Sequence, residues 1–203
     1  MIRSVLACIL LLAPALAAAQ PAQQADPDWP CQQIKVPSLS LAAVWSGPPV
    51  DPAATPWRRD EAVSELVSQI TPRRVPIDRA QSMIDSFAAH SGDQRQQRLL
   101  SLIAGVYTEL DEERSSVIAG LSRFGTRQKE LAAAIRSDNE ELRAMQTNSS
   151  TDAKAVQAMT QKVTWEAEVF QDRSRAITFA CEVPAKIEQR FFALAHQIQK
   201  DLE

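Results

Sequence analysis

A seven-residue repeat of apolar side chains runs through the C-terminal half of the chain and limits its fold more than any other feature. Side chains three and four residues apart share one face of an α-helix, so a repeat sustained over two long segments predicts coiled-coil helices. The two series of the first segment are Leu100, Tyr107, Arg114, Leu121, Gln128, Ile135 and Leu142, and Ile103, Leu110, Val117, Phe124, Leu131, Asp138 and Met145. Those of the second segment are Val156, Val163, Phe170, Ile177, Pro184, Phe191 and Ile198, and Met159, Glu166, Arg173, Ala180, Ile187, Leu194 and Asp201.

The polar stretch TNSSTD separates the two segments and has the composition of a tight turn between helices. We therefore expect long helices over residues 93–146 and 152–201 that fold back on each other as an antiparallel coiled-coil hairpin. Each would be about 75 Å long, which exceeds the core of a chain of this size, so residues 120–176 should project. Pro184 lacks a backbone N–H and predicts a kink or break in the second helix.

The first 19 residues have the features of a secretory signal peptide. A basic residue, Arg3, precedes a short apolar run, and small residues stand before residue 20. Cys8 raises the alternative of a lipoprotein, but the residues before it make a poor lipid-attachment sequence. The segment resembles the signal peptides of Gram-negative exported proteins, which implies a periplasmic location. It is too short to span a membrane, and no later segment reaches that length.

Removal of Arg3 leaves 21 basic against 25 acidic residues, a net charge of −4. This balance argues against nucleic acid or an anionic membrane as a partner. Cys31 and Cys181 are then the two remaining cysteines, and an even pair in an oxidising compartment predicts a disulfide. Free thiols or an intermolecular bridge are the alternatives. A bridge across 150 residues would stabilise the fold by about 4 to 5 kcal/mol in the chain-entropy model.

Residues 20–57 contain many prolines together with apolar side chains, which predicts an extended but ordered strap. Residues 58–203 would form the helical part, with two short helices over 58–70 and 78–89 before the hairpin.

An additional apolar stripe lies outside the repeat, at heptad positions c and g of the second long helix. We expect the strap, fixed at Cys181, to lie along this stripe. Its members are Trp165, Val169, Ala176, Phe179 and Val183.

Trp165 and Val169 are candidate partner-binding residues if the strap leaves them exposed, because exposed aromatic side chains often anchor a partner. The alternative is that the strap covers Trp165. Arg114 in the first long helix should lie near Pro184, where it could bind a freed carbonyl or extend to water.

No catalytic constellation stands out in the sequence. It lacks Cys-x-x-Cys, a glycine-rich phosphate loop, Gly-x-Ser-x-Gly and His-Glu-x-x-His. His90 and His196 are isolated from other metal-binding residue types, so we predict no metal, no cofactor and no enzymatic activity. Glu166, Arg173, Gln128 and Asp138 are polar residues within the repeat, which usually set register.

The sequence thus predicts an all-α protein: a small helical bundle with a long antiparallel coiled-coil hairpin and a proline-rich N-terminal strap. The hairpin is similar in outline to periplasmic coiled-coil chaperones and adaptors. We expect a non-enzymatic interaction, scaffold or adaptor module that binds another periplasmic or envelope protein, without membrane insertion. A periplasmic chaperone or assembly factor is one alternative, and a small-ligand binder or enzyme with a pocket between the base helices and the strap is another. The hairpin could also pair with a second copy as a homodimer.

Overall fold

The computed structural model describes residues 26–202, and every regular element in that range is helical. The predicted signal peptide, over residues 1–19, and residues 20–25 of the strap lie outside it. Short 3-10 turns cover Leu41–Ala43, Trp57–Arg59 and Gly92–Gln94. The α-helices are α1 (Glu61–Ile70), α2 (Ile77–Ala89), α3 (Arg95–Thr147), α4 (Ala153–Ala180) and α5 (Val183–Lys200). The predicted all-α fold with a helical hairpin is confirmed.

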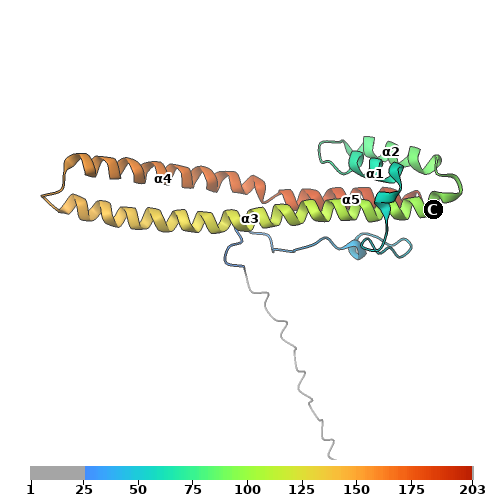
Figure 1. Ribbon diagram of the computed structural model, residues 1–203, viewed down its shortest axis with the longest axis horizontal. Coiled ribbons are helices and arrows are strands. Elements are labelled where there is room, and N and C mark those ends of the chain that lie inside the picture. The colour runs from blue at the N-terminus through green and yellow to red at the C-terminus, as the bar shows by residue number, and fades with distance from the viewer. Residues whose placement is uncertain (1–25, 203) are drawn as a thin grey trace, which may run out of the picture.

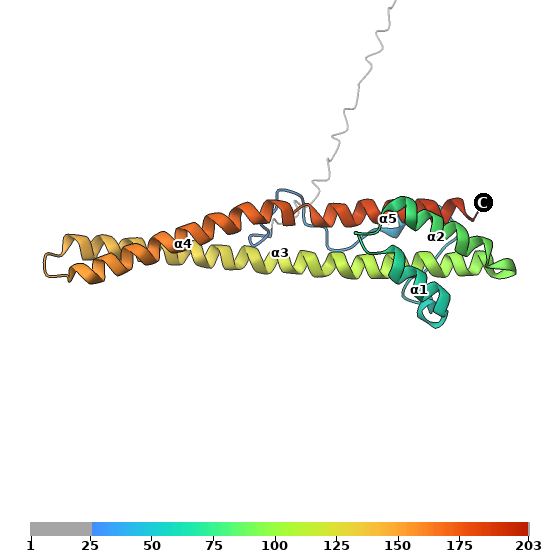
Figure 2. The same ribbon diagram turned by 90° about the horizontal axis from the view of Figure 1, so that it is seen from above.

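Helix α3 has 53 residues and is about 80 Å long. It runs antiparallel to α4 and then to α5 (Figures 1 and 2). The turn between α3 and α4 is closed by Asp152, whose side chain accepts from the Lys154 N–H and caps α4. Cross-hairpin contacts fix the register, including Gln128 Nε2 to the Phe170 carbonyl at 3.3 Å and Lys162 to Asp138 at 2.8 Å. The distal half of the hairpin extends beyond α1 and α2 (Figure 1).

The second long helix, predicted over residues 152–201, is divided in two. The break falls at Cys181 and Glu182, between α4 and α5, and Pro184 lies in the first turn of α5. Proline has no N–H to donate to the Ala180 carbonyl, yet it is well tolerated near a helix start. Pro184 therefore gives the predicted break, and the disulfide lies in the same turn.

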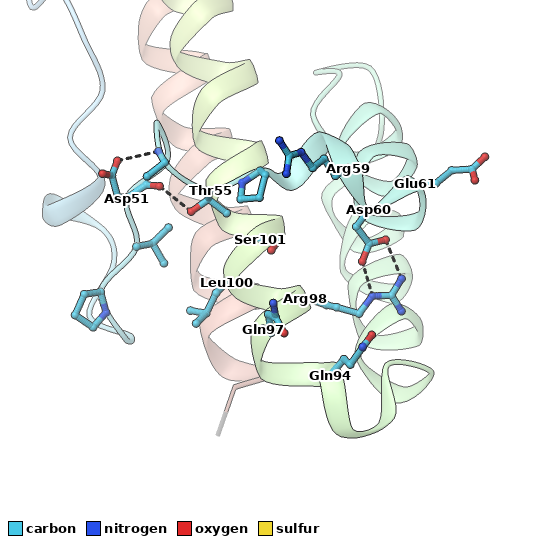
Figure 3. A pocket seen from close by; sticks show the side chains of 14 residues that line it. Asp51, Thr55, Arg59, Asp60, Glu61, Gln94, Gln97, Arg98, Leu100 and Ser101 are labelled. Carbon is cyan, nitrogen blue, oxygen red and sulfur yellow. Dashed lines mark hydrogen bonds and ion pairs between the residues drawn. The ribbon is translucent and has the colours of Figure 1, made fainter.

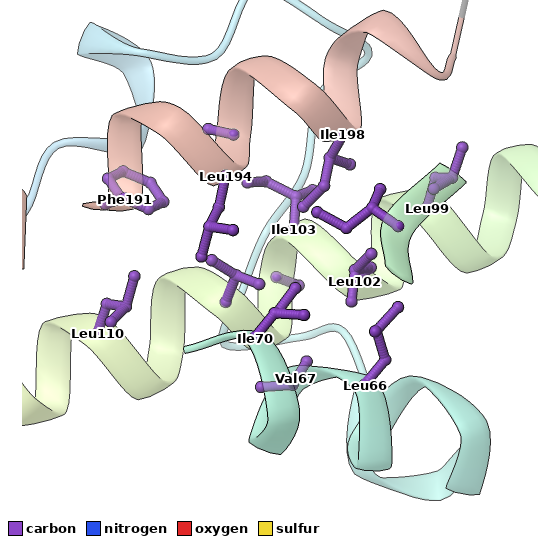
Figure 4. Packing of buried hydrophobic residues seen from close by; sticks show 14 of the residues in the cluster. Leu66, Val67, Ile70, Leu99, Leu102, Ile103, Leu110, Phe191, Leu194 and Ile198 are labelled. Carbon is purple, nitrogen blue, oxygen red and sulfur yellow. The ribbon is translucent and has the colours of Figure 1, made fainter. Parts of the chain in front are cut away.

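The core lies at the base, where α1, α2, α3 and α5 meet (Figure 4). Most side chains of the repeat are buried there, with Leu100 and Tyr107 half-buried, because the short helices pack against the two long helices as these pair with each other. Gly105 of α3 allows α1 and Trp57 to pack closely against α3, since a Cβ atom at position 105 would lie 2.7 Å from Val67 and 2.9 Å from Trp57. Fully buried members of this core include Ile70, Ile84, Leu99, Leu102, Ile103, Leu110, Ile187, Leu194 and Ile198.

The strap and the short helices lie on opposite flanks of the hairpin (Figure 1). If the Leu100 and Val156 series are position a, the short helices contact residues at position g. On α5, Arg190 donates to the Ile70 and Val75 carbonyls, and Gln197 donates to Asp85 of α2 at 2.7 Å. The strap instead reaches residues on the e side, such as Asp111. A two-helix coil has two such flanks, and this chain covers both at its base.

The strap runs antiparallel to α3 and is bound to it by a series of hydrogen bonds. Asp28 pairs with Thr126 and Lys129, Lys35 with Ser122, and the Leu39 N–H with Asp111. The disulfide between Cys31 and Cys181 then joins the strap to the turn between α4 and α5. The prediction that the strap lies along the apolar stripe of the second long helix is wrong.

Arg114 connects three segments at the middle of the hairpin. Its side chain is only 4% exposed; it donates to the Val36 carbonyl of the strap at 2.5 Å and pairs with Glu188 of α5 at 2.7 Å. It therefore binds neither the carbonyl freed by Pro184 nor bulk water, and both expectations for this residue are wrong. Arg114 is tolerated within the apolar repeat because its guanidinium group is paired with both the Val36 carbonyl and the Glu188 carboxylate.

Candidate functional site

The two candidate partner-binding residues lie on α4 in the distal half of the hairpin. Trp165 is 63% exposed, Val169 is half-buried, and Phe179 on the same side of α4 is 72% exposed. The alternative in which the strap covers Trp165 is therefore wrong. We call this surface the open flank: the g side of the hairpin beyond α1 and α2, comprising Trp165, Val169, Phe179, Arg123 and Arg127.

The predicted disulfide is confirmed, with an S–S distance of 2.01 Å and Cα atoms 5.6 Å apart. Its position explains why the open flank is uncovered. Cys181 falls at heptad position e, whereas the apolar stripe occupies c and g on the other side of the seam. The bridge therefore holds the strap on the flank opposite Trp165. The e position of Cys181 already indicated in the sequence that a strap bonded to it would lie away from the stripe, and the sequence-based interpretation overlooked this indication.

Three arginines from both helices line one cavity of about 370 Å³ at the edge of the open flank. Arg123 and Arg127 come from α3, and Arg173 comes from α4 at a seam position. An arginine cannot be buried in a two-stranded seam without a partner, so Arg173 lies exposed at the edge of the seam. Beside it Gln128, also a seam residue, donates to the Phe170 carbonyl and to Ser174. The sequence indicated polar seam residues here but not their convergence on one cavity.

A second polar cluster sits further toward the tip of the hairpin. Asp138 of α3 is 9% exposed and pairs with Lys162 of α4 at 2.8 Å, while Glu166 lies 3.9 Å from the same ammonium group. The hydrogen bond from Lys162 holds the pKa of Asp138 below its usual range. Burial, and then the neighbouring Asp138 carboxylate, raise the pKa of Glu166. Two carboxylates thus share one lysine, and Glu166 is the one that resists ionisation.

This arrangement predicts that Glu166→Gln stabilises the hairpin near neutral pH. Because the folded-state pKa is raised, the folded protein holds a proton that the unfolded chain releases above about pH 4.3, so wild-type stability falls as pH rises through that window. Glu166→Gln has no carboxyl group to ionise at this position, so its stability does not fall with pH for this reason. Thermal unfolding from pH 4 to 8 should show a higher Tm for Glu166→Gln at neutral pH, with the difference shrinking toward acid. Glu168→Gln, at an exposed position of the same helix, is the control; an equal gain there would contradict the assignment.

Two cavities at the base do not assemble catalytic groups. The larger, about 800 Å³, is an open space between the C-terminal end of the strap, the start of α1 and the start of α3 (Figure 3). Its central charges are already paired, since Arg98 makes two hydrogen bonds to Asp60, at 2.8 and 3.0 Å, and this partner lowers the pKa of Asp60. Asp60 also caps α1. Asp60 and Arg98 therefore have a structural role, which is to hold the start of α1 against α3.

The other cavity, about 500 Å³, lies between the strap and α5, where the small-ligand hypothesis placed a pocket. Its walls are largely apolar, with Val36 and Leu39 from the strap and Phe191 and Phe192 from α5. His196 stacks on Phe192, and His90 contacts the Ser86 carbonyl at its own helix end. Among residues 26–202 no three His, Cys, Asp or Glu side chains gather closely enough to hold a metal ion.

Comparisons with family models, curated proteins and solved structures find no match to this chain. None of the described helices is both long and apolar enough to cross a membrane. The open flank and the arginine cavity are the two described features that suggest a function.

Proposed function

We propose that this protein is an exported, non-enzymatic interaction module, a scaffold or adaptor whose protruding hairpin binds another envelope protein along the open flank. The observation that carries the proposal is the exposure of Trp165 and Phe179 on the open flank of the hairpin. A bridge between Cys31 and Cys181 supports an oxidising compartment, in keeping with the predicted signal peptide.

At the base of the molecule the g side of the hairpin is covered by other helices, whereas in the distal half it is not. At the base this side is filled by α1 and α2, which bury the corresponding side chains Leu99 and Val106 completely. From Val183 toward the tip of the hairpin, α1 and α2 no longer cover the g side. The exposed aromatic side chains start there, with Phe179 one turn away. Exposed apolar area costs about 25 cal/mol per Å², and a partner covering this flank would recover it. The surface is thus suited to a further helix that continues the cover supplied by α1 and α2.

Photo-cross-linking in intact cells tests the proposal. A photoreactive amino acid at Trp165 should give one discrete adduct, identified by mass spectrometry, whereas the same probe at Thr160 should give none. Thr160 is exposed on the same helix but faces the other flank. Trp165→Ala should change the free energy of unfolding by no more than about 0.5 kcal/mol, because the side chain is mostly exposed. Equal labelling from both probe positions, or none from either, would contradict the proposal. An adduct with a second copy of the chain would identify a homodimer instead, which sedimentation would verify.

A periplasmic chaperone or assembly factor is the second candidate, favoured by the same exposed aromatic residues. It predicts suppression of aggregation of an unfolded outer-membrane protein by the purified chain, and loss of that effect in Trp165→Ala. Retention of the effect in the variant would separate this activity from the open flank.

A further inference from the structure

We infer that the cavity lined by Arg123, Arg127 and Arg173 is a binding site for a phosphate group, carried by a small molecule or by a lipid headgroup. Arg123 and Arg127 also belong to the open flank, but the phosphate contacts involve their charges and not the apolar side chains of the proposed function, so the inference does not rest on that function. It lies in the shaft of the hairpin, between α3 and α4.

The three guanidinium groups lack counter-charges within residues 26–202. None of them takes part in an ion pair there. The acidic neighbours on α4 are engaged elsewhere: Asp172 pairs with Arg175, and Glu166 lies beside Lys162. Three like charges around one cavity repel each other, and although water and salt weaken this repulsion between exposed side chains, a bound anion would reduce it further.

The donor groups around the cavity also favour an oxyanion. Guanidinium groups present paired N–H donors that match the oxygens of phosphate, and arginines approaching from two helices can bind different oxygens. Gly120 keeps one wall free of a side chain, because even a Cβ atom there would meet only Arg123, at 3.9 Å.

A volume of about 370 Å³ exceeds what inorganic phosphate needs, so the site has room for a phosphomonoester. Phe124 lines the same cavity and offers an apolar surface to the remainder of such a ligand. A dianionic group satisfies the three positive charges better than a monoanion does, which favours a terminal phosphate over a single carboxylate.

Thermal unfolding and isothermal titration of the oxidised protein test this assignment, with inorganic phosphate and glycerol 3-phosphate as probes and sodium acetate at equal ionic strength as the reference. We expect a higher Tm in phosphate than in acetate, because a ligand bound only by the folded state stabilises it. The dissociation constant should be millimolar or tighter. Arg127→Gln should weaken phosphate binding at least about tenfold, since each charge-assisted hydrogen bond is worth a factor of that order. Arg136→Gln, on α3 but outside the cavity, should leave it unchanged.

Arg127→Gln should also raise the Tm measured without phosphate, because it removes repulsion within the cluster. An equal phosphate-induced shift in Arg127→Gln and wild type, or no shift in wild type, would overturn the assignment. Vesicles containing phosphatidic acid, compared with phosphatidylcholine vesicles, separate the two sources. Sedimentation with the former alone, lost in Arg127→Gln, indicates a lipid headgroup, and binding of glycerol 3-phosphate without vesicle sedimentation indicates a free ligand.

Discussion

Removal of the disulfide by Cys31→Ser with Cys181→Ser lowers the free energy of unfolding by about 4 to 5 kcal/mol, the largest effect expected of any change considered. The bridge closes a loop across a sequence separation of 150 residues, and a cross-link of that span greatly reduces the entropy of the unfolded chain. It also joins the strap, which has no regular backbone ladder, to the turn where α4 gives way to α5.

Denaturant unfolding with and without a reducing agent measures this effect. Reduced wild type and the double variant should unfold at the same, lower denaturant concentration, and the reductant should not affect the double variant. Limited proteolysis should then cut the strap between residues 26 and 40 while the hairpin remains intact. A double variant as stable as the oxidised wild type would show that the hydrogen bonds to α3 hold the strap without the bridge.

Gly125→Ala destabilises the protein by about 1 to 3 kcal/mol, the range for forcing extra atoms into a packed contact. A Cβ atom at position 125 would collide with the backbone carbonyl of Asp28, so the strap must move away from α3. That movement disrupts the hydrogen bonds that the Asp28 carboxylate accepts from Thr126 and Lys129. The obstacle is main chain rather than a flexible side chain, and it cannot rotate out of the way.

Gly120→Ala provides the matched control, because it makes the same chemical change one turn and a half away in the same helix. A Cβ atom there meets only Arg123 at 3.9 Å. Alanine is preferred over glycine within a helix by about 1 kcal/mol, so this variant should be slightly more stable than wild type. Thermal unfolding of the two variants should therefore shift in opposite directions. If both gain stability, the strap does not contact α3 at Gly125.

The hairpin follows from the sequence because its information is local. Each heptad places apolar side chains on one helix face, and TNSSTD permits only a short reversal, so pairing and direction are fixed together. Pro184 likewise marks the break between α4 and α5 by a property of its own backbone. The Cys31–Cys181 pairing was predictable because the chain offers one pair once the signal peptide is set aside.

Only the tertiary structure decided what covers each flank of the hairpin. The choice depends on contacts between distant segments: Gly125 admits the strap, Arg114 supplies it with a donor, and Cys181 at an e position ties it there. An irregular segment has no periodicity from which its path could be read. The exposure of Trp165 is a consequence of that path, for which the e position of Cys181 was the one local indication. The convergence of the three arginines depends on contacts between α3 and α4, which no local pattern encodes.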